Sequence, residues 1–181
     1  MVNYARANPL ITPAGVLAQT LDPHNTAAAV TGLTTGGAVA CNIIGLPAGL
    51  TVTNITISIA GTAANGPTHF WLALLDSALK VLAVSADQGN AAQPSNTPLK
   101  LAMGTPYVIP ATGYYYVAAS SSASTTAPTL AGSAAITAIG NLVPAPYGLA
   151  GTQATPPALG AQLNSGALSA SNNCNFAAWI S

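Results

Sequence analysis

The sequence predicts an all-β protein, an antiparallel β-sandwich with jelly-roll-like connectivity and an extended N-terminal arm. Two observations lead to this class. The 181 residues include 17 Gly and 14 Pro, which divide the chain into short segments. Those segments are of strand length, and no long stretch keeps the 3.6-residue apolar period of a helix. We expect seven or eight strands.

The first 24 residues predict an extended arm or an edge segment, followed by a β-sandwich domain over residues 25–181. Three prolines in this stretch disfavour a helix. The arm is nevertheless too apolar for a free tail, since it carries Tyr4, Leu10, Ile11, Val16, Leu17 and Leu21. We expect the arm to bury these side chains on a neighbouring subunit, so that its deletion leaves the melting temperature of the domain nearly unchanged.

The first two strands are predicted at residues 38–46 and 50–60, joined by the turn "PAG" at 47–49. The second strand alternates, but its phase slips: its first two apolar residues have one parity and its three isoleucines have the other. A β-bulge near Thr53 and Asn54 would point both sets toward the core.

The segment "HFWLALL" at residues 69–75 is apolar on both parities, which predicts a strand that is covered on both faces or bulged. Residues 81–85 form the next strand. Between the two lies "DSALK", in which a helix would make an i,i+4 ion pair of Asp76 and Lys80. We favour a hairpin because Asp76 and Ser77 are turn residues and the flanking apolar runs are short.

Three further strands follow a polar loop, at residues 99–103, 106–110 and 114–122. Residues 121–173 are rich in Ser, Ala, Gly and Pro, which predicts mostly loop with two short strands. A strand over residues 174–181 closes the chain, and its Phe176 and Trp179 are expected to add mass to the core, with a role as an interface anchor as the alternative for Trp179.

The chain carries little charge. Only 3% of its residues are charged and its net charge is zero, against about 25% charged residues in a typical soluble domain. No Lys/Arg cluster exists for a nucleic-acid footprint. Polar residues, Gly and Pro interrupt every apolar run well before the ~20 residues of a membrane span, and the N-terminus does not have the pattern of a signal peptide. A neutral surface has little repulsion against association, which predicts a subunit of a large assembly.

Residues for catalysis are scarce. A hydrolase triad can be drawn from His69, Asp87 and a serine, but the chain has no G-x-S-x-G motif and no metal-ligand spacing. The other histidine, His24, falls in an expected turn. We therefore expect no catalytic residue, cofactor or metal. Cys41 and Cys174 are expected to be buried thiols, with a single disulfide as the alternative in an oxidising compartment.

The aromatic residues suggest contacts. Tyr114, Tyr115 and Tyr116 alternate faces on one strand. One interpretation is that the outward tyrosines contact a partner or a sugar; the other is that the tyrosines fill the core with their hydroxyls at the rim. The candidate interface or glycan contacts are Tyr114, Tyr116, Trp71 and Tyr4. For a glycan, the polar loop "SADQGN" at residues 85–90 would lie beside the tyrosine strand.

Two patterns resemble a β-sandwich module of tailed-bacteriophage virion proteins, of the decoration, head-fibre or minor-tail type. The first is a hairpin pattern L-x-D-x-x-x-x-x-L-A, matched by Leu74, Asp76, Leu82 and Ala83. The second is a strand pair y-x-I/L-P-A-G-x-Y-Y-V, with an extra Thr112 before its glycine, matched by Tyr107, Ile109, Pro110, Ala111, Gly113, Tyr115, Tyr116 and Val117. The resemblance covers roughly residues 40–120.

The resemblance implies a structural virion protein that acts by assembly contacts and carries no catalytic residues. Its expected partners are copies of itself, for which we favour a trimer, and other virion proteins such as the major capsid or tail proteins. The chain would be made in the host cytoplasm and reside in the virion. The alternative is a carbohydrate-binding adhesin module for host-surface glycans. Neither nucleic acid nor a membrane is expected as a partner.

Overall fold

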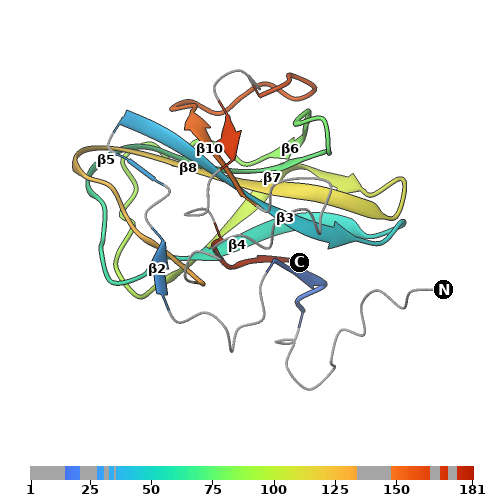
Figure 1. Ribbon diagram of the computed structural model, residues 1–181, viewed down its shortest axis with the longest axis horizontal. Coiled ribbons are helices and arrows are strands. Elements are labelled where there is room, and N and C mark those ends of the chain that lie inside the picture. The colour runs from blue at the N-terminus through green and yellow to red at the C-terminus, as the bar shows by residue number, and fades with distance from the viewer. Residues whose placement is uncertain are drawn as a thin grey trace.

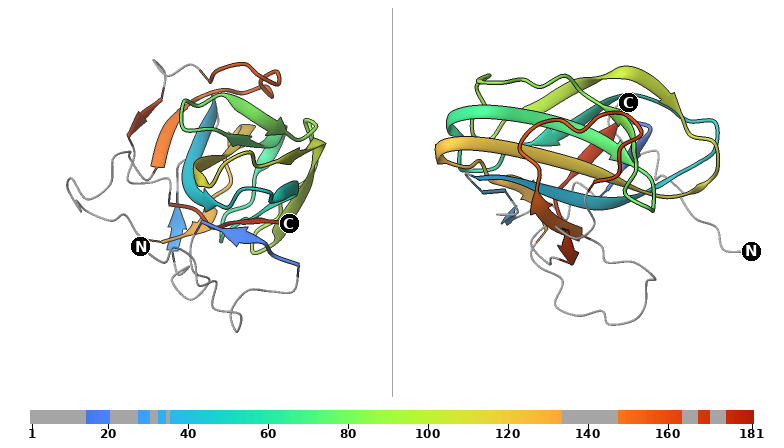
Figure 2. Two further views of the ribbon diagram at one scale, coloured as in Figure 1. Left: turned by 90° about the vertical axis from the view of Figure 1, so that its right-hand side faces the viewer. Right: turned by 90° about the horizontal axis from the view of Figure 1, so that it is seen from above.

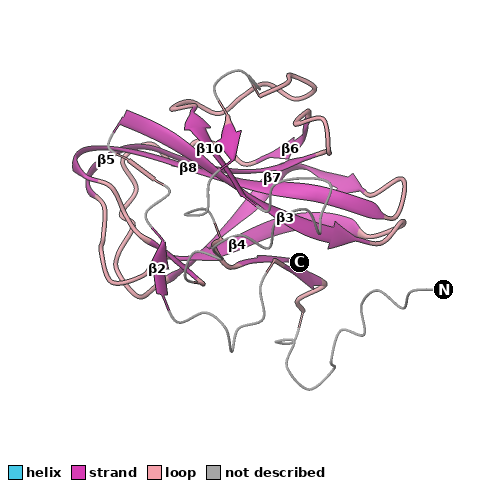
Figure 3. Cartoon of the chain, in the orientation of Figure 1, coloured by secondary structure: helices cyan, strands magenta, loops and turns pink. Residues whose placement is uncertain are grey.

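The computed structural model describes residues 15–20, 28–30, 33–34, 36–133, 148–163, 168–170 and 175–181. These residues form strands and loops only (Figure 3). None of them belongs to a helix long and apolar enough to span a membrane. The strands are β1 (Ala18–Gln19), β2 (Ala28–Val30), β3 (Gly36–Leu46), β4 (Thr51–Ser58), β5 (Asn65–Leu75), β6 (Val81–Val84), β7 (Pro98–Val108), β8 (Gly113–Thr126), β9 (Leu130–Gly132), β10 (Gly148–Thr152), β11 (Ser169–Ala170) and β12 (Ala178–Ile180).

Two antiparallel sheets face each other, which confirms the predicted β-sandwich (Figure 1). The four-stranded sheet has the order β1-β12-β4-β7, and the six-stranded sheet has the order β11-β10-β3-β8-β5-β6. A small pair, β2-β9, adjoins them. Bridges between Ser85 and Met103 and between Ile59 and Leu130 link elements beyond these ladders. The jelly-roll connectivity stays a prediction.

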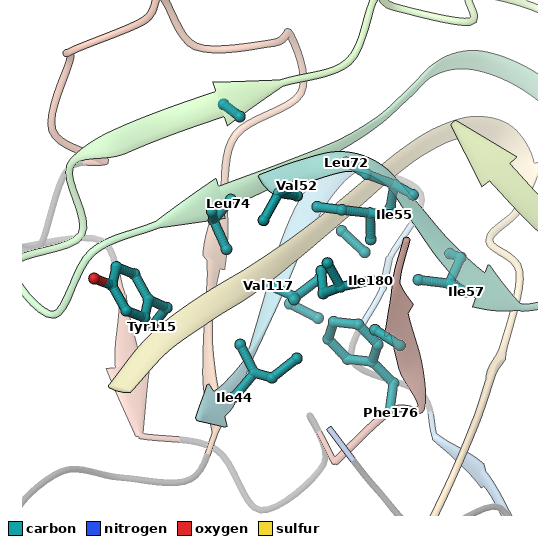
Figure 4. Packing of buried hydrophobic residues seen from close by; sticks show 14 of the residues in the cluster. Ile44, Val52, Ile55, Ile57, Leu72, Leu74, Tyr115, Val117, Phe176 and Ile180 are labelled. Carbon is teal, nitrogen blue, oxygen red and sulfur yellow. The ribbon is translucent and has the colours of Figure 1, made fainter. Parts of the chain in front are cut away.

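The main core lies between the two sheets and is made of alternate residues from each (Figure 4). Strand β4 contributes Val52, Ile55 and Ile57, all fully buried. Its register against β7 shifts between Val52 and Asn54, which confirms the predicted bulge. The backbone oxygen of Ser181 accepts hydrogen bonds from the amides of Thr53 and Asn54, at 3.0 and 2.7 Å, so the bulged amides are satisfied.

The six-stranded sheet is buried on its outer face as well. A second apolar cluster there contains Trp71, Leu75 and Tyr116, and residues 153–163 lie over it as a third layer (orange in Figure 1). The indole N–H of Trp71 donates to the carbonyl of Ala154 at 3.0 Å. The prediction that the strand at 69–75 is covered on both faces is therefore confirmed.

The hairpin between β5 and β6 is confirmed, and the helical alternative is excluded. One carboxylate oxygen of Asp76 accepts hydrogen bonds from the amides of Ala78 and Lys80, at 2.8 and 2.9 Å. Leu79 has a φ of 64°, a conformation that usually selects glycine. Its side chain packs against the second apolar cluster, which explains a leucine at this position.

Strand β7 runs without a break where two strands were expected. Pro106 lies inside it, but β7 is the last strand of the four-stranded sheet. A proline that lacks an N–H is tolerated on such an edge because no ladder bond is lost on the open side. Lys100 and Pro98 also lie on this strand, and both residue types protect edges against pairing with other chains.

Part of the N-terminal arm docks on the sandwich itself, which differs from the expected docking on a neighbour. Strand β1 pairs with β12, and the amide of Leu17 donates to Ile180 O at 2.8 Å. The hydroxyl of Thr20 donates to Phe176 O at 2.8 Å. The sheet therefore begins before residue 25, whereas residues 1–14 and 21–24 lie outside the described part of the chain.

Phe176 and Trp179 have different positions. Phe176 is fully buried in the main core, as expected. Trp179 is only partly buried and lies on the outer face of the four-stranded sheet, because its neighbours Ala178 and Ile180 point into the core. The expectation that Trp179 adds mass to the core is therefore wrong.

Candidate functional site

The predicted contact residues are not equally available. Trp71 and Tyr116 are 0% and 4% exposed, under the third layer, so they act as core residues. Tyr115 also lies in the core, and its hydroxyl donates to Ala111 O at 2.8 Å at the rim (Figure 4). Tyr4 lies outside the described residues. Tyr114, which is 51% exposed, is left as the one described candidate that can touch a partner.

The glycan arrangement of tyrosines beside "SADQGN" is not formed. Asp87, in the middle of that loop, accepts a hydrogen bond from the amide of Phe70, and Phe70 pairs with Ser121 on β8. Ser121 is seven residues further along β8 than Tyr114, which is about 23 Å along an extended strand. The loop and the exposed tyrosine therefore lie toward opposite ends of β8.

Tyr114 belongs to one end of the sandwich, which we call the tip: residues 47–49 and 108–114. Here the β3–β4 turn and the β7–β8 connection lie side by side (right in Figure 1, facing the viewer in Figure 2, left). The amide of Gly49 donates to Ile109 O at 2.8 Å, and the amide of Ala48 donates to the hydroxyl of Thr112 at 3.0 Å. Each of the two loops connects one sheet with the other, and these bonds join the loops, so the tip is held as one unit.

The tip presents an exposed surface without any charged side chain. Val108 is 58% exposed and Tyr114 is 51% exposed, which makes them two of the four large apolar side chains with high exposure among the described residues. The other exposed residues of the tip are Pro47, Ala48, Gly49, Pro110, Ala111 and Thr112. Asp76 begins the adjacent hairpin after Leu75, which pairs with Tyr116, so charge occurs beside the tip rather than on it.

No protein-family model, curated protein or solved structure matches the chain. A rigid, neutral and partly apolar end is suited to binding another macromolecule, because contact there desolvates no charge and orders no loop.

His69 and Asp87, two members of the triad considered from the sequence, are in contact. Nδ1 of His69 lies 2.6 Å from Oδ2 of Asp87, and Oδ1 of Asp87 accepts hydrogen bonds from the amides of Phe70 and Gly89, at 3.1 and 2.9 Å. Burial raises the pKa of Asp87, but the hydrogen bond with the imidazole and those with the two amides outweigh burial, so the pKa lies below its ordinary value.

The His69–Asp87 pair is arranged to stabilise a loop and not to activate a nucleophile. Ser122 is opposite His69 in the ladder between β5 and β8, but its hydroxyl is buried and makes no hydrogen bond with the imidazole. A nucleophile needs that contact with its base. Asp87 lies in the loop after β6, and its carboxylate accepts a hydrogen bond from the backbone amide of Phe70 on β5. This bond attaches the loop to β5 beyond the point where β6 ends.

Metal and thiol chemistry find no support in the described part of the chain. No group of three or more His, Cys, Asp or Glu side chains gathers there. Cys41 is a buried thiol in the second apolar cluster. Cys174, its possible disulfide partner, lies outside the described residues.

Val108 is an exposed residue that the sequence patterns did not single out, and Trp179 is a partly exposed residue that they placed in the core. For Trp179 the signal was available: in "FAAWI", Phe176, Ala178 and Ile180 share one parity, which leaves Trp179 on the other. For the tip, the turn signals "LPAGL" and "VIPATG" predict two loops. The contact between these loops depends on pairing of strands about 60 residues apart in sequence, which neither signal predicts.

Proposed function

We propose that the chain is a structural protein of a tailed-bacteriophage virion, and that it acts through assembly contacts made by the tip. The observation that carries this proposal is the exposure of Val108 and Tyr114 on a rigid surface that has no charge. The virion assignment draws its support from the resemblance in residues 40–120 together with the β-sandwich.

The energetics of the tip favour association. Covering a fully exposed valine is worth about 1.5–3 kcal/mol, and a tyrosine buries a larger area. Both residues flank turns that are already hydrogen bonded, so little conformational entropy is lost on binding. Tyr is also among the residues enriched at protein interfaces.

Copies of the same chain are the partner we favour, with a trimer as the preferred state. Around a symmetry axis each side chain lies close to its own copies, so a charged tip would repel itself. The tip of this chain avoids that repulsion because it carries no charged side chain. Other virion proteins would be contacted by the remaining surface.

Sedimentation velocity at several concentrations tests the assembly contact. We expect self-association of the wild-type chain, and at least about tenfold weaker association for Val108→Asp, which places a carboxylate in the contact. Leu159→Asp is the matched control, because Leu159 is 55% exposed, close to the 58% of Val108, but belongs to the third layer and not to the tip. A wild-type chain that stays monomeric at every concentration contradicts the proposal, as does equal weakening by both variants.

The virion assignment has its own test. Phage particles from a lysate whose genome carries this coding sequence are purified on a density gradient, and their peptides are identified by mass spectrometry. We expect the chain to band with intact particles. Recovery of the chain only from the soluble fraction would contradict its role as a virion protein, whatever its oligomeric state.

A further inference from the structure

The outer face of the four-stranded sheet carries a row of side chains that the tip does not use. The register places Gln19 of β1 opposite Trp179 of β12, Trp179 opposite Thr56 of β4, and Thr56 opposite Lys100 of β7. Directly opposite residues point to the same face. Ile55, Ile57 and Ile180 point the other way, into the core, which fixes this row as the outward one.

Two polar atoms in the row have no hydrogen-bond partner. They are the indole Nε1 of Trp179, which only donates, and the amide Oε1 of Gln19, which only accepts. Both atoms are buried, so water does not satisfy them either. A buried polar atom without a partner is unfavourable, so a group that satisfies both atoms would be bound with a gain in free energy.

A hydroxyl group matches this pair. It has one O–H to donate to Oε1 of Gln19 and lone pairs to accept from the indole N–H of Trp179. A carboxylate or phosphate would satisfy only the indole, and an ammonium group would satisfy only the amide oxygen. The chemistry of the pair therefore favours a neutral group that both donates and accepts, as a hydroxyl does.

The surroundings of the indole favour a sugar among such ligands. Thr56 lies beside Trp179, and the next outward residues of β4 are Asn54 and Ser58, all neutral and able to hydrogen bond. The indole of Trp179 is partly exposed, and an aromatic ring is the type of apolar surface on which the C–H groups of a pyranose ring pack. Lys100 is the one charged residue in the row, one strand beyond Thr56.

We propose that this face, made of Gln19, Trp179 and Thr56, is a carbohydrate-binding site. The sugar ring packs on the indole while its hydroxyls bond to Nε1 of Trp179 and Oε1 of Gln19. Both atoms are buried in the unliganded chain, so binding requires the side chain of Gln19, which lies on a two-residue strand, to turn outward. The site is independent of the tip and does not require the proposed virion function.

Nuclear magnetic resonance titration tests the site directly, because the chain has only two tryptophans and hence two indole N–H signals. Trp71 is the internal reference, since it is 0% exposed and bonded to Ala154 O. The variant Trp179→Phe assigns the signals by removing one. The probes are N-acetylchitotriose, maltotriose and trigalacturonic acid, each added to about 10 mM, which reaches sites with Kd near 1 mM.

We expect at least one probe to shift the Trp179 signal in a saturable way while the Trp71 signal stays in place. Gln19→Ala should weaken that probe about fivefold or more, whereas Tyr114→Ala, at the tip, should leave its affinity unchanged. Three outcomes overturn the proposal: no probe moves the Trp179 signal, Gln19→Ala binds like the wild type, or the signal moves with protein concentration alone. The last would assign the face to a second copy of the chain.

Discussion

Asp87 accepts more hydrogen bonds than the other described aspartate, Asp76, and the loss of its carboxylate should be measurable. We expect Asp87→Asn to lower the free energy of unfolding by about 1 kcal/mol at pH 7, because an amide replaces the ionised acceptor of His69 and two backbone amides. The measurement is urea denaturation of both proteins. The value is modest because the Asp87 side chain is 29% exposed.

The pH dependence of this difference follows from the lowered pKa of Asp87. The unfolded chain binds the proton first, at about pH 3.9, so the contribution is complete above that pH and is lost as the pH falls through the lower folded pKa. We expect the wild-type and Asp87→Asn stabilities to converge below about pH 4. A difference that stays constant down to the acid limit of folding would contradict the assignment.

At the scale of single elements, the β5–β6 hairpin should depend on one side chain. We expect Asp76→Ala to destabilise the protein by about 1 kcal/mol, because the amides of Ala78 and Lys80 lose their acceptor. Ser77→Ala is the control in the same turn: Ser77 is exposed, so its replacement should change stability by less than about 0.5 kcal/mol. Thermal melting of the three proteins decides, and equal effects of the two variants would count against the role of Asp76.

The elements that the sequence predicted best are those set by neighbouring residues. The bulge at Thr53 followed from a slip in parity within one strand, and the hairpin followed from Asp76 and Ser77 between two apolar runs. The sheet positions were harder. Strand β12 lies between β1 and β4, and no local pattern shows that residues 19 and 56 both adjoin Trp179. The candidate sites depend on such distant pairings, so the sequence suggested aromatic contacts but chose Trp71 and Tyr116, which are buried.

For the whole molecule, the scarcity of charge predicts association that hardly depends on salt. The described residues include four charged side chains, Asp76, Lys80, Asp87 and Lys100, and none lies on the tip. Salt weakens contacts between exposed charges, whose interaction is largely screened beyond a Debye length of about 10 Å at 0.1 M. We expect the association constant to change less than about threefold between 50 and 500 mM NaCl, measured by sedimentation. A steep fall with salt would place the contact at the charged hairpin instead.

The third layer over the six-stranded sheet limits which sequences can keep this structure. A Cβ atom at position 37 would lie 2.5 Å from Cβ of Ala154 and 2.7 Å from the hydroxyl oxygen of Ser122, and Gly37 also has a φ of +81°. Any side chain there would push away the segment that carries the acceptor for Trp71. In a library of variants selected for folding, position 37 should therefore remain glycine, while exposed residues of the same layer, such as Leu159, diversify freely. The sequence changes that this layer tolerates during evolution are thus limited more by its contact with strand β3, which it covers, than by its exposure to solvent.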